Sequence, residues 1–352
     1  MELLSVTMND GVKPRSEIEG KDNSSEDKSN YKIVRKGDMV YNSMRMWQGA
    51  NGISPCDGIV SPAYTVLMPK QEINNGYFAA LFKSANLINE FRKNSQGMTS
   101  DTWNLKYPQI ETIKIQIPSV SEQDKVSELF GVLDARIVAQ AQLIEALKKY
   151  KRGVMRAIFR DKSFVFSKAT VWKSIHLGDE CVFFSGGTPK STDSSYYGGS
   201  IPFIRSGEIH GEKTELFLTE AGLQNSSAKM VSKGDLLIAL YGATSGEVDI
   251  SKIDGAINQA ILCIRPYDMS KQYLRYLLED SKDDIINTYL QGGQGNLSAE
   301  IIKNLRVDIP DSTAQSSVVE FLSMIERRIE MSVEEYEQIQ AMKRSLLQQL
   351  FI

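Results

Sequence analysis

The sequence VSELFGVLDARIVAQAQLIEALKKYKRGVMRAI, residues 126–158, follows a heptad pattern, with apolar side chains recurring at alternating steps of four and three residues. This spacing is typical of a helix that packs along a second helix. Residues 318–350 repeat the pattern after an offset of 192 residues. Both copies interrupt the apolar seam at the same two positions, with Gln140 and Lys151 in the first copy and Ser332 and Lys343 in the second. Polar seam residues fix alignment and partner, so we predict that these helices pair with each other.

A second match lies outside the helices. Val34-Arg35-Lys36-Gly37-Asp38-Met39-Val40 returns as Val231-Ser232-Lys233-Gly234-Asp235-Leu236-Leu237 after 197 residues. The repeat unit is therefore more than half the chain, far longer than the roughly 20 to 50 residues of a solenoid repeat. It predicts two complete domains, each followed by a long helix of about 40 residues and roughly 60 Å.

The globular parts have the pattern of mixed α and β structure. Each part ends on Ile-Pro, at Ile117-Pro118 and Ile309-Pro310, before its long helix. We expect Ser121, with Glu122 and Asp124, to cap the first helix, and Ser312 or Thr313 to cap the second. Short apolar runs bounded by Gly, Asn and Pro predict strands at 38–41, 64–67, 113–117, 235–240, 260–265 and 305–309, with helices at 77–91 and 271–289.

Composition excludes several classes of protein. The 352 residues suggest two or three domains, and no run approaches the ~18 apolar residues of a membrane span. Met1-Glu2-Leu3-Leu4 lacks the features of a signal peptide, so we expect a cytoplasmic protein without membrane contact. The cysteines and histidines predict neither disulfides nor a metal site: Cys56, Cys181, Cys263, His176 and His210.

Catalytic motifs are also missing. The nearest match to the Asn/Asp/Ser-Pro-Pro-aromatic motif of amino-methyltransferases is Ser61-Pro62-Ala63-Tyr64, which departs from it at the third position. No Gly-x-x-x-x-Gly-Lys-Ser/Thr sequence occurs, and no acid/base pair or partnered nucleophile is evident. We therefore expect a protein that has no catalytic residues and is not itself an enzyme.

The repeated plan resembles the specificity subunit of type I restriction-modification enzymes (HsdS). The resemblance covers essentially the whole chain, and its most specific stretches are Val40-Tyr41-Asn42-Ser43-Met44-Arg45-Met46-Trp47-Gln48-Gly49 and Gly58-Ile59-Val60-Ser61-Pro62-Ala63-Tyr64. It implies an α+β fold with two tandem target-recognition domains, each followed by a long helix, and with the helices paired as an antiparallel coiled coil. The expected ranges are 1–118 and 161–311 for the two domains, and 119–160 and 312–352 for the helices.

The resemblance also implies a function and partners. Each domain would read half of a split sequence in double-stranded DNA, and the helices would act as a spacer and as a dock for methyltransferase (M) subunits, with restriction (R) subunits joining through these. S-adenosylmethionine, ATP and Mg would be used by the partner subunits, and this chain would bind no cofactor. The net charge of −3 and pI near 5.7 are unusual for an autonomous DNA binder, so we expect the chain alone to bind DNA weakly.

Base-reading residues are expected among polar and aromatic side chains of the loops, where the two copies diverge. In the first domain these are Asn42, Arg45, Trp47, Gln48, Thr99, Asp101 and Trp103. In the second domain they are Thr188, Lys190, Arg205, Ser206, Tyr241, Thr244, Ser245, Asn258, Gln259, Gln291, Gln294 and Asn296. Packing is an equally good interpretation for the two tryptophans.

The first domain departs from the plan at its start. The second copy has 59 residues from Trp172 to Val231, whereas 33 precede Val34, so about 25 residues of an opening segment have no match. Such a difference would leave an exposed sheet edge or an incomplete core. An inactive or truncated specificity-subunit variant therefore stays an alternative, as does a coiled-coil scaffold that binds proteins through its tandem domains.

Overall fold

The computed structural model describes residues 1–8, 10–22, 24–162, 170–289 and 296–351. These residues form two compact units. Unit 1 comprises Met1–Ile144 and Ser332–Ile352, and unit 2 comprises Glu145–Met331. Each unit contains a globular part and one end of each of the two long helices, α4 (Val120–Phe159) and α9 (Ser312–Gln349).

The described residues of unit 1 form two sheets and three short α-helices. The first sheet has the order β2-β1-β6-β3, and the second has the order β5-β4-β7. The strands are β1 (Glu2–Thr7), β2 (Gly11–Pro14), β3 (Lys32–Val34), β4 (Met39–Asn42), β5 (Asn51–Ile53), β6 (Gly58–Val60) and β7 (Tyr64–Leu67), and the short helices are α1 (Asn75–Leu81), α2 (Ala85–Asn94) and α3 (Tyr107–Ile110).

Unit 2 repeats this plan and adds to it. Its sheets have the orders β11-β10-β15-β12, β14-β13-β16-β9 and β17-β8. The strands are β8 (Trp172–His176), β9 (Cys181–Ser185), β10 (Tyr197–Ile204), β11 (Leu216–Leu218), β12 (Lys229–Val231), β13 (Leu236–Ala239), β14 (Val248–Ile250), β15 (Gly255–Ile257), β16 (Ile261–Pro266) and β17 (Arg306–Pro310). The helices are α5 (Leu177–Glu180), α6 (Glu220–Gln224), α7 (Lys271–Tyr289) and α8 (Ala299–Lys303).

The Lys-Gly-Asp repeat forms the same turn in both units. Gly37 and Gly234 adopt φ of 90° and 91°, a region that side chains other than glycine rarely enter. The following aspartates close the turn, since Asp38 accepts a hydrogen bond from the Arg35 N–H and Asp235 from the Ser232 N–H. The repeated motif is therefore explained by a turn that leads into β4 and β13.

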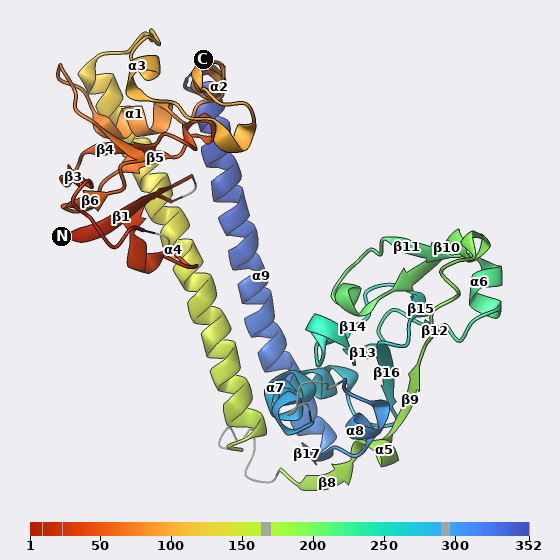
Figure 1. The fold of residues 1–352 in the computed structure, drawn as a ribbon. Coiled ribbons are helices and arrows are strands. Elements are labelled where there is room, and N and C mark those ends of the chain that lie inside the picture. Colours follow the sequence, from red (N-terminus) through yellow and green to blue (C-terminus); the bar gives the residue numbers. More distant parts are fainter. Residues whose placement is uncertain (9, 23, 163–169, 290–295, 352) are drawn as a thin grey trace. The chain divides into compact units, whose positions relative to one another are not determined.

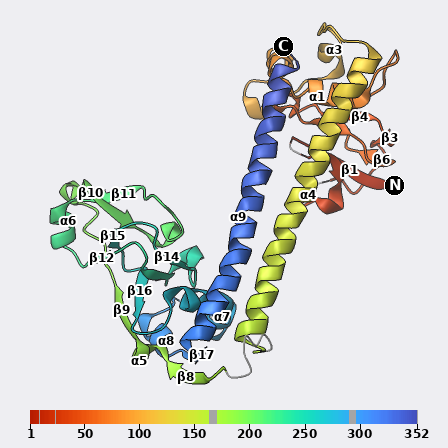
Figure 2. The same ribbon diagram turned by 180° about the vertical axis from the view of Figure 1, so that it is seen from behind.

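Within each unit, the segments of the two long helices lie side by side and run in opposite directions (Figures 1 and 2). Within unit 1, the Gln140 Nε2 donates to the Ser332 carbonyl at 2.9 Å, so the two matching polar seam positions face each other. The lysine positions also match, because Lys343 pairs with Asp134 in unit 1 and Lys151 pairs with Glu326 in unit 2. The predicted fold class, including the antiparallel coiled coil, is confirmed.

The seam residues belong to the cores of the globular parts as well. In unit 1, Phe130 and Leu133 of α4 share a core with Tyr77 of α1 and Phe91 of α2. One tyrosine–phenylalanine contact occurs in both units, and in unit 1 the ring centroids of Tyr77 and Phe351 are 5.4 Å apart. The equivalent distance for Phe159 and Tyr273 in unit 2 is 5.5 Å. The repeated phenylalanine after Lys-Arg thus anchors each helix end to a globular part.

Several local predictions are wrong. The helix expected at 77–91 is interrupted, because Ser84 accepts a hydrogen bond from the Leu87 N–H and starts the new helix α2. Residues 113–117 form no strand, since no strand pairs with them in the described part of unit 1.

The expected helix caps are displaced by one or two residues. Ser119, not Ser121, begins α4 in a reciprocal capping box with Glu122. Asp311, not Ser312 or Thr313, caps α9 by accepting from the Ala314 N–H at 3.0 Å. Serine and aspartate side chains at these nearby earlier positions are equally good acceptors, and the sequence pattern does not separate such neighbours.

A pair of glutamines that the sequence analysis missed ties each globular part to its long helix. The Gln123 amide accepts from the Asn74 N–H at 2.9 Å and donates to the Pro118 carbonyl at 3.0 Å. Gln315 makes the same two bonds to Ser270 and Pro310, at 3.0 Å each. Both glutamines are buried. Their 192-residue spacing was the signal that could have revealed them.

Candidate nucleic-acid interface

The candidate loops of each unit meet at one backbone hydrogen bond. In unit 1 the Leu105 N–H donates to the Ser43 carbonyl at 2.8 Å, which joins the turn after β4 to the segment before α3. In unit 2 the Leu297 N–H donates to the Leu240 carbonyl at 2.9 Å, which joins the turn after β13 to the segment before α8. The leucine that donates each bond is buried, so the bond holds the two loops of each unit together in the same way. We call this arrangement of buried leucine and joined loops the frame.

In unit 1, two tryptophans bring the candidate loops together. The ring centroids of Trp47 and Trp103 are 5.2 Å apart at an interplanar angle of 78°, an edge-to-face contact. The Arg92 guanidinium lies 5.8 Å from the Trp47 ring, and the Trp47 indole donates to the Met44 carbonyl at 3.1 Å. The packing interpretation of the two tryptophans is therefore supported, and both remain half-buried.

The other unit 1 candidates lie around this pair. Asn42 has its side-chain oxygen engaged by the Met44 N–H at 3.1 Å. Arg45 and Gln48 are half-buried, whereas Thr99 and Asp101 are exposed in the short 3₁₀ turn at Ser100–Thr102. The structure thus gathers all seven candidates on two joined loops, and their role in base reading stays a prediction.

In unit 2, one group of candidates lies where β9 meets the turn before β16. The Thr188 hydroxyl donates to the Gln259 amide oxygen at 2.6 Å. The Gly186 N–H donates to the Asn258 carbonyl at 3.3 Å, and the Asn258 side chain accepts from the Ala260 N–H. Lys190 is exposed on the same segment as Thr188.

A second group surrounds the turn after β13. The 3₁₀ turn at Gly242–Thr244 packs against the 3₁₀ turn at Ser206–Glu208, so Ser206 and Thr244 lie on neighbouring turns. The Ser245 hydroxyl donates to the Leu240 carbonyl at 3.0 Å, and Tyr241 packs against the unit 2 core. Asn296 is exposed directly before Leu297, whereas Gln291 and Gln294 lie outside the described residues.

Arg205 is the unit 2 candidate most engaged within the protein. Its guanidinium contacts Glu208 at 3.1 Å and Glu215 at 2.6 Å, and these hydrogen bonds raise its pKa. Burial raises the pKa of Glu208, but the hydrogen bonds from Arg205 and from the Glu215 N–H outweigh it and bring the value to about 2. Because two carboxylates hold Arg205, a contact with a base would require it to exchange these partners.

His210 joins this neighbourhood, and the sequence analysis did not single it out. Its Nδ1 lies 2.8 Å from Asp249, and its Nε2 lies 3.4 Å from Glu247. The hydrogen bond with Asp249 raises the pKa of the imidazole. Nothing in the spacing of a lone histidine and carboxylates almost 40 residues away could have predicted this cluster.

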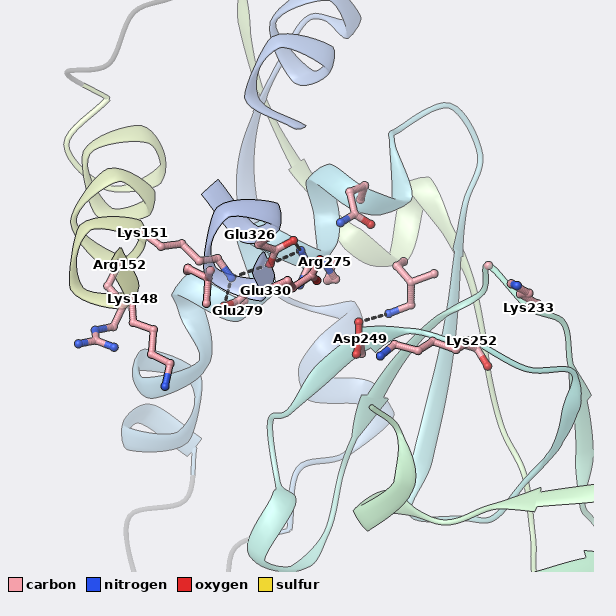
Figure 3. Close-up of a pocket in the computed structure, with 15 residues that line it drawn as sticks. Lys148, Lys151, Arg152, Lys233, Asp249, Lys252, Arg275, Glu279, Glu326 and Glu330 are labelled. Atoms are coloured by element: carbon pink, nitrogen blue, oxygen red, sulfur yellow. Dashed lines mark hydrogen bonds and ion pairs between the residues drawn. The ribbon is translucent and has the colours of Figure 1, made fainter. Parts of the chain in front are cut away.

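A charged groove of about 680 Å³ lies in unit 2 beside the seam lysine. Figure 3 shows Glu326 between Lys151 and Arg275. The Glu326 carboxylate lies 2.8 Å from Lys151 and 2.7 Å from Arg275, and Glu279 lies 2.6 Å from Lys151. Lys148, Arg152, Lys233 and Lys252 line the groove as well. The second break in the apolar seam is therefore an ion-pair network that binds α7 to both long helices.

Comparison with known proteins decides the family. The sequence model of the type I restriction modification DNA specificity domain matches residues 5–149 and again residues 170–341. The chain belongs to this family. The two matched segments coincide with the two copies of the internal repeat.

Relatives of this specificity-domain protein cover most of its length. The MjaVIII specificity subunit of Methanocaldococcus jannaschii is 25% identical over 340 residues, which cover 90% of this chain and 78% of the relative. The MjaX specificity subunit of the same organism is 24% identical over 286 residues, or 77% of this chain. The aligned part spans 65% of the MjaX subunit.

Solved structures show the same fold. A chain from a type I R-M system, studied for complex assembly and conformational transition, gives a TM-score of 0.62 at 17% identity over 92% of this chain and 83% of that chain. The S subunit from M. genitalium gives 0.59 at 17% identity, over 91% and 84%. At these identities the similarity establishes the fold of the specificity-domain protein.

Metal sites and membrane-spanning helices are both absent among the described residues. Among the described residues, no group of three or more His, Cys, Asp or Glu side chains is placed to hold a metal ion. Within the same residues, no helix is long and apolar enough to cross a membrane.

Proposed function

We propose that this chain is the sequence-reading subunit of a type I restriction-modification complex. Its two globular parts would each bind one half of a split target in double-stranded DNA, and the paired helices α4 and α9 would dock methyltransferase subunits. Restriction subunits would join through these partners. The chain itself would carry no catalytic group.

One observation carries the proposal. Both units build the same frame, in which a buried leucine N–H ties the turn after the central strand to the segment before a short helix. The side chains on these frames differ, with Trp47 and Trp103 in unit 1 and Tyr241 and Asn296 in unit 2. A shared frame with different loops suits a protein that reads two different half-sites, as dimeric DNA-binding proteins read half-sites at a fixed spacing.

The charge of the chain supports a reader that depends on partners. With a net charge of −3, the chain lacks the cationic surplus that normally supplies phosphate contacts. The methyltransferase subunits would supply those contacts, and S-adenosylmethionine, ATP and Mg would serve the partner subunits. We therefore expect the complex to bind DNA far more tightly than the chain alone.

The experiment is co-expression of the chain with type I methyltransferase subunits of its host, followed by genome-wide mapping of adenine methylation. We expect a stable complex and methylation at one bipartite asymmetric motif. A stable complex without methylation would support the alternative of an inactive variant. The absence of any complex would contradict the proposal.

A matched pair of variants tests the loops in the same assay. Gln259→Ala removes an exposed amide of the candidate surface, and we expect methylation to fall about tenfold or to relax at one position of one half-site. Gln224→Ala removes an exposed amide from α6, outside the candidate loops, and should leave the methylation pattern unchanged. Equal effects of the two variants would argue against Gln259 as a base contact.

A further inference from the structure

The charged groove of unit 2 has a counterpart in unit 1, a cavity of about 380 Å³ lined by residues of β2, β5, α1, α4 and α9. Helices α1 and α7 align at an offset of 196 residues. The aromatic contacts agree with this alignment, because Tyr77 and Tyr273 each pack against the repeated phenylalanine. Asn75 and Lys271 also match, since each donates to the glycine carbonyl of its Lys-Gly-Asp turn. The two sites can therefore be compared residue by residue.

A carboxylate of the unit 2 site is replaced by a lysine in unit 1. Glu279 of α7 lies 2.6 Å from Lys151, the seam lysine of its unit. Lys83 has the matching position after α1, and its charge interacts with that of Lys343, the seam lysine of unit 1. Lys343 keeps Asp134 as its partner but has no counterpart of Glu279. Unit 1 thus holds two lysines where unit 2 pairs a lysine with a glutamate.

The unit 1 site also has smaller side chains. Arg275 and Gln272 of α7 line the groove of unit 2. Their counterparts on α1 are Ala79 and Gly76, which line the cavity of unit 1, so no side chain takes the place of the Arg275 guanidinium. Apolar walls come from β2, β5, α4 and α9: Val12, Ile53, Phe130, Ile137 and Leu347. Mostly apolar walls, few polar groups and volumes of about 300 to 1,000 Å³ are typical of small-molecule sites.

Lys83 is half-buried, and its ammonium group has no hydrogen-bond or ion-pair partner among the described residues. The two aspartates of the cavity are paired with other lysines, Asp10 with Lys13 at 3.4 Å and Asp134 with Lys343. Burial lowers the pKa of Lys83 and the charge of Lys343 lowers it further, which outweighs the opposite effect of Asp134 and Asp10. A cation that has lost hydration without gaining a partner would be stabilised by an added anion.

We propose that this cavity binds a small organic molecule with one carboxylate group on an apolar body. The carboxylate pairs with Lys83 and lies near Lys343, as the Glu279 carboxylate pairs with Lys151 in unit 2. The apolar body contacts the walls of the cavity. A doubly charged anion such as phosphate fits less well, because Asp10 and Asp134 line the same cavity and would repel it. No candidate base-reading residue lines the cavity, so the site is separate from the proposed DNA reading.

Titration calorimetry of the full chain with hexanoate tests the site, and we expect saturable binding at one site per chain. Hexanamide has the same apolar chain without the charge and should bind at least about tenfold more weakly, because it forms no ion pair with Lys83. Acetate has the charge without the chain and should also bind at least about tenfold more weakly, because it buries fewer methylene groups. Equal affinities for hexanoate and hexanamide, or no saturable binding of hexanoate, would overturn the proposal.

Substitutions of Lys83 locate the site. Lys83→Gln removes the unpaired charge, so we expect a folded protein whose affinity for hexanoate is reduced at least about tenfold. Lys83→Glu supplies the carboxylate that unit 2 has at Glu279, so hexanoate binding should be lost while the melting temperature does not fall. Lys70→Gln removes an exposed lysine outside the cavity and should bind hexanoate like the unchanged chain. If both Lys83 variants keep the original affinity, the cavity is not the site.

An acidic side chain of a partner polypeptide would carry the same carboxylate group, and N-acetylglutamate α-amide mimics such a side chain. Its carboxylate stands on a short chain next to two polar amides, which the apolar walls would leave without hydrogen bonds. We therefore expect it to bind more weakly than hexanoate in the same titration. Tighter binding of N-acetylglutamate α-amide would assign the cavity to a partner's side chain, and the assignment to a free small molecule would be wrong.

Discussion

Glu326 is the residue on which the charged network of unit 2 depends, because it is shared by Lys151 and Arg275. Both cations are nearly buried, with 12% and 10% of their side chains exposed. Burial raises the pKa of Glu326, but the hydrogen bonds and charges of Arg275 and Lys151 outweigh it and hold the pKa below its usual range. In unit 1 the equivalent pair, Lys343 with Asp134, is more open, since the aspartate side chain is 55% exposed.

Because the two ion pairs differ in burial, we expect matched substitutions in them to lower the free energy of unfolding by different amounts. Glu326→Gln leaves two nearly buried cations to share Glu279 as their remaining charged partner, and we expect it to lower the free energy of unfolding by roughly 2 to 3 kcal/mol. Asp134→Asn breaks an exposed pair and should cost less than about 1 kcal/mol. Urea denaturation followed by circular dichroism measures both values, and equal costs would contradict the network described.

The ion pairs of Asp235 should make the folded state less stable in acid. Burial raises its pKa, but hydrogen bonds from Arg265, the Ser232 N–H and Lys271 outweigh this and bring the pKa to about 2. A carboxylate with a lowered pKa in the folded state contributes stability that is complete above its unfolded value near 3.9 and is lost as the pH falls toward 2. We expect Asp235→Asn to flatten the fall of the unfolding free energy between about pH 4 and pH 2. An unchanged slope would show that this ion pair does not contribute.

At the scale of elements, two buried glutamine clamps, Gln123 and Gln315, hold each globular part on the first turn of the following helix. Each amide is buried, accepts from an N–H in front of α1 or α7, and donates to the proline carbonyl in front of its long helix. Removing such a side chain leaves both backbone groups without their partner.

We therefore expect Gln123→Ala and Gln315→Ala each to lower the free energy of unfolding by about 1 to 3 kcal/mol. Gln315→Glu keeps the oxygen that accepts from Ser270 but cannot donate to Pro310, so its cost should be at least as large near neutral pH. Thermal denaturation with matched Gln142→Ala, an exposed helix position, provides the reference. A Gln315→Ala variant as stable as this reference would contradict the role assigned to the clamp.

The long elements were predictable because their patterns are long. The heptad seam gave both helices and their pairing, and α7 has the predicted bounds of 271–289. Residues 113–117 have the composition of a strand but lack a pairing strand in the structure, which no local pattern reveals. The candidate loops were found from their polar residues, whereas the His210 cluster and the glutamine clamps depend on contacts between distant segments.

At the scale of the whole molecule, the chain is an approximate internal duplication whose copies share a frame and differ in their loops. The frame comprises the Lys-Gly-Asp turn, the buried leucine, the glutamine clamp and the seam lysine with its carboxylate. In the proposed function, the two different sets of loop residues on this frame would read two different half-sites.

The most direct measurement replaces residues 172–310 with the corresponding residues of another family member and maps adenine methylation in the co-expressed complex. We predict that one half of the bipartite motif changes to that of the donor protein while the other half is retained. A change in both halves, or in neither, would contradict the assignment of one globular part to each half-site.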